Sequence, residues 1–276
     1  MSFVVKSSGD SHMALITLAR LAFQRQMAYR VANIAGLITN AFFGLLRGAV
    51  LIALFNAQAN PVVAGYRVED ALTFAALTQA VLAYIGLWGW WDVVRNVRSG
   101  DIATDLARPI SFFWYWWAQD VGRALGQLLM RGVPIVLFFA WVYPVHWPAS
   151  LTQWLLFTLS MALALFVSFA WRFLVSLSAF WTQDAMGVMR MSMGVVTILS
   201  GFTLPISFFP DWAARLMQLL PFAGMVNTPI EIFAGVLQGE LLFVRLAMQA
   251  FWGIALLLLA QWVLSQGVRK LVIQGG

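Results

Sequence analysis

Long apolar runs separated by short polar segments dominate the pattern along this chain. Six runs approach the length of about 20 residues that crosses about 30 Å of hydrocarbon. They lie at residues 31–55, 71–91, 125–143, 151–175, 186–208 and 241–264. The pattern predicts an all-α membrane protein with six transmembrane helices in one domain, residues 31–266.

An interfacial helix is predicted over residues 13–29, before the first span. Ile16, Phe23 and Met27 would lie on one side of this helix, and Arg20 and Gln24 on the other. Such a helix lies along the bilayer surface, and residues 1–30 would form a cytoplasmic tail together with it. The alternative is a frayed cytosolic tail.

Composition supports the membrane class. The chain is 62% hydrophobic and 10% charged, whereas soluble domains carry about 25% charged residues. Residues 1–11 are polar and no cleavage site follows, so no cleaved signal peptide is predicted. The lack of Cys excludes disulfides, thiolate metal sites and cysteine nucleophiles.

Basic residues set the predicted orientation. With the N-terminus in the cytoplasm, Arg67, Arg215 and Arg245 lie outside, and most other basic residues lie at inner ends of spans. By the positive-inside rule, we expect both termini in the cytoplasm and the chain in a plasma membrane, such as the bacterial inner membrane. The net charge of +6 then reflects topology, and no basic patch for nucleic acid is present.

Two connections between the runs carry information. In the inner segment 92–123, Gly100 turns the chain, residues 102–107 can form one or two helical turns, and Pro109 ends them. The aromatic run 112–117 that follows is typical of an interfacial belt, with direct substrate contact as the alternative.

The outer segment 200–239 is broken by prolines and glycines. Its pieces are too short to span and too apolar for a solvated loop, so we expect re-entrant or surface helices before the last span. These would form an outer gate. Its candidate residues are Gly201, Pro205, Pro210 and Pro221.

A family resemblance rests on the inner segment. Gly100, Ile102, Leu106, Pro109 and Gly122 resemble the G-x-(I/L)-x-x-x-L-x-x-P pattern of type 2 ABC exporter (ABC-2 family) permeases, six-span subfamily. The proline spacing of the outer segment and the short basic tail 267–276 are similar too. The tail departs from the pattern, because it has Leu271 and Val272 where a tyrosine and a charged residue are expected.

The resemblance implies the permease subunit of an ATP-driven exporter. Two permeases, identical or sisters, would each receive one ATPase subunit, so two ATPase copies act per complex. The chain has no G-x-x-x-x-G-K-[ST] loop, so it is no enzyme by itself, it binds no cofactor, and ATP and Mg belong to the partner. The coupling segment would be residues 100–109, with Asp101, Asp105 and Arg108 contacting the ATPase.

Rival functions differ in the residues that they require. An intramembrane enzyme needs a nucleophile with a base, or metal ligands, and only His12 and His146 exist, both outside the spans. An ion-coupled carrier usually has acids inside its spans. None falls in the six runs, and Asp184 and Glu231 lie at their edges. A non-transporting assembly subunit is a further alternative.

Arg47 is the residue within a span that most needs an explanation. A charge near the bilayer centre costs about 2.5–3.5 kcal/mol. Arg47 therefore either faces a cavity or a subunit interface, or it snorkels to the membrane surface. Arg131 would snorkel inward and Arg172 would reach toward Asp184.

Aromatic residues suggest the substrate class. The chain has 14 Trp and 22 Phe, and aromatic faces bind lipophilic or cationic molecules. This favours an amphiphilic drug, lipid or peptide-like substrate, if the rings line the path rather than face lipid.

Overall fold

The computed structural model describes residues 8–89, 91–182 and 185–269, and within them the chain is helical with no strand. Five helices of this part are long and apolar enough to cross a membrane. They are α2 (Arg30–Asn56), α3 (Val68–Ile85), Phe112–Val142, Leu151–Thr182 and α13 (Gly239–Val268). The all-α membrane class is confirmed.

The fifth predicted span is shorter than expected. The helix α10 (Met186–Leu199) has 14 residues, or about 21 Å at 1.5 Å per residue, and does not reach residue 208. The chain turns at Gly201, whose φ of 79° lies in the left-handed region that glycine tolerates best. The predicted count of six full-length spans is therefore not confirmed.

Two other boundaries differ from the predicted ones. The helix α3 ends at Ile85 and not at residue 91, because Gly86 adopts a φ of 64° and caps the helix. The third long helix begins at Phe112 and not at residue 125. It is built from α6 (Phe112–Gln127), the π-helix η1 (Leu128–Gly132) and α7 (Val133–Val142).

The helix α1 (Ser8–Ala28) packs along α6, and only Tyr29 separates it from α2. Two glycines on α6 permit this approach: a Cβ on Gly122 would lie 2.0 Å from the Ala19 carbonyl oxygen, and one on Gly126 would lie 2.8 Å from Gln26 Cβ. The helix predicted for the bilayer surface thus has one side against the bundle. Ile16, expected on the apolar side, is 70% exposed.

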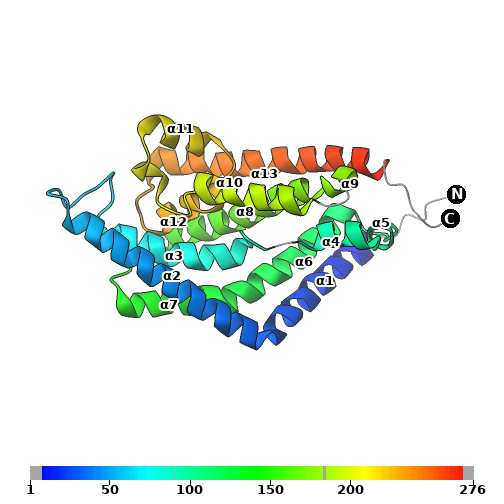
Figure 1. Cartoon of the computed structure of the whole chain (residues 1–276), viewed down its shortest axis with the longest axis horizontal. Helices are drawn as coiled ribbons and strands as arrows, with labels where there is room; N and C mark the ends of the chain where they lie inside the picture. The colour runs from blue at the N-terminus through cyan, green and yellow to red at the C-terminus, as the bar shows by residue number, and fades with distance from the viewer. Residues whose placement is uncertain (1–7, 90, 183–184, 270–276) are drawn as a thin grey trace.

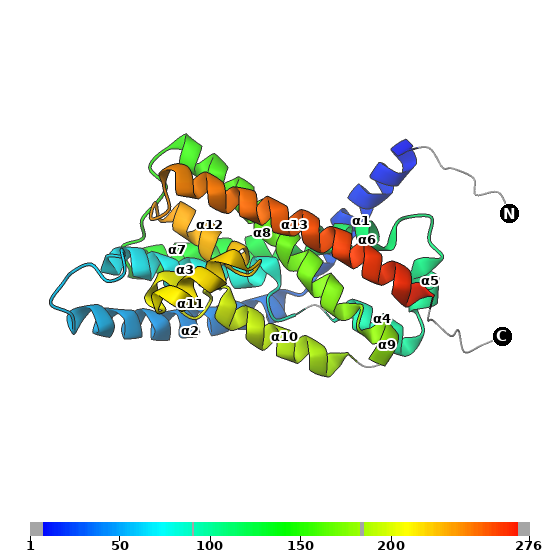
Figure 2. The same cartoon turned by 90° about the horizontal axis from the view of Figure 1, so that it is seen from above.

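The long helices run side by side around α3 (Figure 1, Figure 2). All of α3 from Asp70 to Ile85 is buried. The start of α1, the end of α13 and the short helices α4 (Asp92–Ser99), α5 (Ile102–Leu106) and α9 (Ala179–Thr182) lie at one end of the molecule (Figure 1). We call this the α5 end. The loops after α2 and α7 lie at the opposite end.

The aromatic run 112–117 lies inside the bundle, so the interfacial-belt interpretation is wrong for most of it. Phe112, Phe113, Tyr115 and Trp116 are at most 8% exposed. They pack in a cluster with aromatic rings of α8 (Leu151–Ser176), including an edge contact of 5.1 Å between the rings of Phe113 and Phe169. Six consecutive aromatic residues on a helix cover its whole circumference, so only some of them can face outward.

The outer segment holds short helices, as predicted. They are η2 (Ile206–Phe208), α11 (Asp211–Leu219), η3 (Ala223–Met225) and α12 (Asn227–Phe233). The helix α12 is almost wholly buried, whereas α11 lies on the surface with Trp212 73% exposed. Residues 1–7 and 270–276, which hold most of the predicted tails, lie outside the described residues, and so does Asp184.

Candidate functional site

The predicted coupling segment forms a compact hairpin of two short helices at the α5 end. Gly100 ends α4 with a φ of 84°, a conformation that costs other residues more, and α5 follows two residues later. Ile102 is 2% exposed and packs in the aromatic cluster of α6 and α8. The hairpin is therefore fixed to the long helices by apolar contacts.

Asp105 is turned toward the protein. The residue is 5% exposed, and its carboxylate accepts hydrogen bonds from Asn96 Nδ2 at 2.8 Å and Arg108 Nε at 3.2 Å. The guanidinium of Arg108 also lies 4.7 Å from the centre of the Tyr115 ring. Asp105 thus holds α4, α5 and α6 together, which is a structural task that the sequence did not predict.

The surface that α5 presents comes from other side chains. Leu106 is half-buried beneath it. The exposed residues are Asp101, Ala103, Thr104, Ala107, Arg108 and Pro109. Small side chains with one acid and one base give a smooth, mixed-charge surface that suits contact with another protein.

A cavity of about 410 Å³ opens beside this surface, between α1, α4, α5 and α6. Arg25 of α1 faces α5 across it, and Tyr115 and Gln119 of α6 form its wall. The nitrogen of the Gln119 amide is buried with no hydrogen-bond partner. The hairpin and α1 therefore share the lining of one cavity.

A buried ion cluster ties the third and fourth long helices to α3. Asp120 is 0% exposed and pairs with Arg123 at 2.7 Å and with Arg172 at 2.8 Å. Arg123 also donates to the carbonyl oxygens of Ala83 and Tyr84, at 3.2 and 3.0 Å. These carbonyls end α3, whose last turn lacks partners within the helix.

The prediction that the spans contain no acidic residue is wrong, because Asp120 lies in one. The apolar run that began at residue 125 missed it, but it lies in the long helix Phe112–Val142. Its spacing of three residues from Arg123 was the available signal. Because two arginines occupy its carboxylate, Asp120 is an ion-pair partner and gives no support to an ion-coupled carrier. Arg172, expected near Asp184, points to Asp120 instead.

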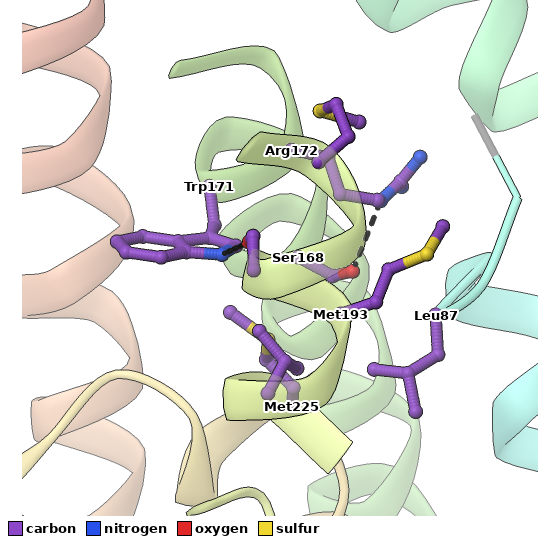
Figure 3. A pocket seen from close by; sticks show the side chains of 9 residues that line it. Leu87, Ser168, Trp171, Arg172, Met193 and Met225 are labelled. Atoms are coloured by element: carbon purple, nitrogen blue, oxygen red, sulfur yellow. Dashed lines mark hydrogen bonds between the residues drawn. The ribbon is translucent and has the colours of Figure 1, made fainter. Parts of the chain in front are cut away.

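A small cavity between α8 and α10 adjoins this cluster (Figure 3). Arg172 and Trp171 lie on opposite sides of it, and Met193 of α10 and Met225 of η3 also line it. Its volume of about 10 Å³ holds about one water molecule, too little for a substrate. The Trp171 indole donates to Ser192 Oγ at 2.8 Å and so fastens α10 to α8.

Arg47 contacts the predicted outer gate. Its Nη1 donates to the Phe202 carbonyl oxygen at 2.9 Å, and its guanidinium lies 4.6 Å from the centre of the Phe202 ring. Arg47 therefore joins α2 to the turn after α10. The sequence prediction of a cavity or subunit interface stays a prediction, and this contact within the chain is a third possibility that the sequence did not suggest.

The gate segment is held by Asn227 of α12. Its side-chain oxygen accepts from the backbone N–H of Ile206 at 3.0 Å, and its backbone N–H donates to the Ser200 carbonyl oxygen at 3.1 Å. A Cβ on Gly201 would lie 2.9 Å from that side-chain oxygen. Pro205 and Pro210 precede η2 and α11, and Pro221 follows α11. Hence Gly201 and Pro205 lie at the bonded turn, and Pro210 and Pro221 flank the surface helix.

Two polar contacts hold the outer loops at the opposite end. The Tyr66 hydroxyl donates to Glu231 at 2.8 Å, and loss of hydration together with this carboxylate raises the pKa of Tyr66. Removal from water likewise raises the pKa of the Glu231 carboxyl. His146 lies between Asp70 at 2.6 Å and Glu69 at 3.3 Å. In the described part of the chain, no group of three ligands could hold a metal ion.

The sequence candidates thus fall into two groups at opposite ends of the molecule. Gly100 to Pro109 gather at the α5 end, whereas Arg47 bonds to the turn between α10 and η2, and α11 and α12 beyond this turn lie toward the opposite end (Figure 1). The sequence analysis missed Asp120, Asn227 and the close contact of α1 at Gly122 and Gly126. The G-x-x-x-G spacing of these two glycines is a known signal for close helix packing.

Comparison with known families covers most of this architecture. A family model described as ABC-2 family transporter protein matches residues 44–275. The chain belongs to the ABC-2 transporter family. No curated protein matches the chain.

Membership settles the general class. ABC-2 proteins of this kind are multi-pass membrane permeases that work with an ABC ATPase partner, and the permease itself is generally non-catalytic. The match begins inside α2, so α1 and the first half of α2 lie outside it.

Proposed function

We propose that this ABC-2 permease exports an amphiphilic substrate, a drug, lipid or peptide-like molecule, using ATP hydrolysed by a separate subunit. The observation that carries the proposal is the α4–α5 hairpin. It exposes a smooth surface at one end of the molecule while its inner side is fixed to the long helices. A partner that pushes on α5 would therefore move α6 and α8.

The path for this motion runs through rigid contacts. Ile102 packs against the rings of α6 and α8, and Asp105 bonds α4 to α5. From α6, the Asp120 cluster reaches α8 and the end of α3. Packed side chains and ion pairs of this kind transmit displacement because they resist compression.

The proposed complex contains two copies of the ATPase, each with its ATP and Mg, and a second permease that is identical or a sister chain. The positive-inside pattern supports a cytoplasmic location for the α5 end and for both termini, in a bacterial inner membrane. The location of α1 and the end of α13 at that same end agrees with this orientation (Figure 1).

Arg47 and the turn at Gly201 would act as the outer gate. Breaking the Arg47–Phe202 contact would remove a link between α2 and the turn after α10. We propose that this separation opens the path when ATP binds. A carrier driven by ions, or an assembly subunit without transport, would need no ATPase at α5.

The test measures capture of the ATPase by the permease in membranes. Arg108→Glu reverses a charge on the exposed surface, whereas Arg215→Glu makes the same change at the exposed α11 of the opposite end. We expect Arg108→Glu to reduce ATPase capture and export, and Arg215→Glu to retain both. Equal capture by the two variants would contradict the proposed docking surface.

A second arm tests energy supply. The purified permease should hydrolyse no ATP, and its complex with the ATPase should. ATP hydrolysis by permease that is verified free of other subunits would contradict the proposal that a separate subunit hydrolyses ATP.

A further inference from the structure

An arginine with no acidic partner lies where η1 crosses α2. Arg131 Nη2 donates to the Gly36 carbonyl oxygen at 3.2 Å and to Asn40 Oδ1 at 3.1 Å. In the described part of the chain no carboxylate lies within ion-pair distance of it. This differs from the ion-paired Arg123 and Arg172 of the same bundle.

The guanidinium sits in a space made by a missing side chain. A Cβ on Gly36 would lie 2.4 Å from Arg131 Cζ, so the flat group rests directly on the backbone of α2. The π-helix η1, Leu128–Gly132, carries Arg131 at this point. Single π turns inside α-helices frequently mark functional sites. Both features orient the guanidinium.

Arg131 keeps hydrogen-bond donors that the described part of the chain does not use. Arg131 Nε is buried with no hydrogen-bond partner, and Nη1 makes no hydrogen bond in the described residues. Asn40 links this site to α3, because its side-chain amide donates to the backbone carbonyl oxygen of Gln79 at 3.2 Å. A cation without a carboxylate partner suits an anion.

The surroundings suit an anion that carries apolar chains. Arg131 is half-buried, so it reaches the surface of the bundle. Exposed apolar side chains lie on other faces of the same helices, at Ile34 and Ile38 of α2 and Leu129 of η1. Gly36 and Asn40 lie six and ten residues after the start of α2, about 9 and 15 Å along its axis. A headgroup at the start of α2 would therefore lie about 9 Å from Gly36 along this axis.

We propose that Arg131, held by its hydrogen bonds to Gly36 and Asn40, binds a negatively charged phosphate group, supplied by a phospholipid headgroup or by free phosphate. The charge of the guanidinium attracts the phosphate, and Nη1, which makes no hydrogen bond among the described residues, donates to a phosphate oxygen. The site needs no ATPase, so its test is independent of the proposed exporter function.

The experiment uses the full-length chain purified in detergent and titrated with three probes. Phosphatidylglycerol carries the phosphate and two acyl chains, diacylglycerol carries the same chains without phosphate, and sodium phosphate has no chains. Bound probe is counted by native mass spectrometry, and Arg131→Gln is compared with wild type. The matched control is Arg190→Gln, because Arg190 is an exposed arginine on the apolar helix α10.

We expect Arg131→Gln to weaken phosphatidylglycerol binding about tenfold, the worth of a hydrogen-bonded charge, and Arg190→Gln to leave it unchanged. Diacylglycerol should bind equally to wild type and to Arg131→Gln. If sodium phosphate competes with the lipid and is also lost in Arg131→Gln, the source is free phosphate. Equal lipid and phosphate binding by wild type and Arg131→Gln, or an equal loss in Arg190→Gln, overturns the proposal.

A second variant keeps the test valid if Arg131→Gln does not fold. Gly36→Ala keeps the charge of Arg131 but displaces its guanidinium, because the added Cβ would lie 2.4 Å from Cζ. It should weaken phosphate-dependent binding while leaving diacylglycerol binding as in wild type. Unchanged phosphatidylglycerol and phosphate binding in Gly36→Ala would show that Gly36 does not position the guanidinium for phosphate, and would overturn the proposed site.

Discussion

Neutralising Asp120 should destabilise the protein far more than neutralising an exposed aspartate of the same geometry. Asp120 and Arg123 are three residues apart on α6, and Asp92 and Arg95 have the same spacing on α4. The Asp120 side chain is 0% exposed, whereas the side chains of Asp92 and Arg95 are 33% and 65% exposed. The two pairs differ in burial, and Asp120 also pairs with Arg172.

The magnitude follows from what remains after the change. Asp120→Asn leaves Arg172, 6% exposed, and the largely buried Arg123 without their counter-charge. Removing one partner of a buried pair costs about 3–5 kcal/mol, whereas an exposed pair contributes about 0–1 kcal/mol. At about 2 °C per kcal/mol for a chain of this size, Asp120→Asn should lower the melting temperature by 6 °C or more.

The assay compares thermal unfolding of wild type, Asp120→Asn and Asp92→Asn in one detergent. We expect Asp92→Asn to melt within about 2 °C of wild type. If Asp120→Asn and Asp92→Asn have the same melting temperature, the negative charge of Asp120 is not needed to stabilise the fold. The cluster would then be no rigid link between α3, α6 and α8.

Three further perturbations test other contacts. Gly122→Val should detach α1 from α6, because even a Cβ would lie 2.0 Å from a backbone oxygen, and protease cleavage between the two helices should accelerate; cleavage at the wild-type rate would contradict the close packing. Arg47→Leu should insert as well as wild type or better but lower export, since it removes the contact with Phe202; normal export would show that the contact is no gate. The folded-state pKa of Glu231 is raised, so protonation of Glu231 stabilises the fold at acidic pH, and this stabilisation is lost as the pH rises through the raised pKa. Glu231→Gln should therefore reduce the loss of folding stability between acidic and higher pH. An unchanged dependence of the melting temperature on pH would contradict this role of Glu231.

Much of the fold could be read from the apolar runs. The first, fourth and sixth predicted spans match α2, α8 and α13 to within four residues at each end. These helices are uninterrupted apolar segments, so length and hydropathy suffice to define them. Gly100 and Pro109 also marked the hairpin of α4 and α5 at the right place, since both residues restrict the backbone locally.

The predictions that were wrong depended on packing. A window that seeks apolar residues excludes Asp120, although a charge is stable inside a span when arginines from its own and a neighbouring helix neutralise it. The aromatic run looked like a belt because periodicity does not show which neighbour a ring meets. In the structure α8 supplies Phe169 and Phe173 beside it.

The sequence by itself determined the membrane class, the positions of most long helices and the turn before α5, because hydropathy and backbone restriction act within a few residues. Only the tertiary structure decided the roles of the polar side chains inside the bundle. Arg47, Arg131 and Arg172 are the same residue type in apolar helices, yet one meets a carbonyl and a ring, one rests on a glycine, and one pairs with an acid. A charge in a nonpolar surrounding takes its role from whichever group the fold places beside it, and that group lies 52 to 155 residues away along the chain.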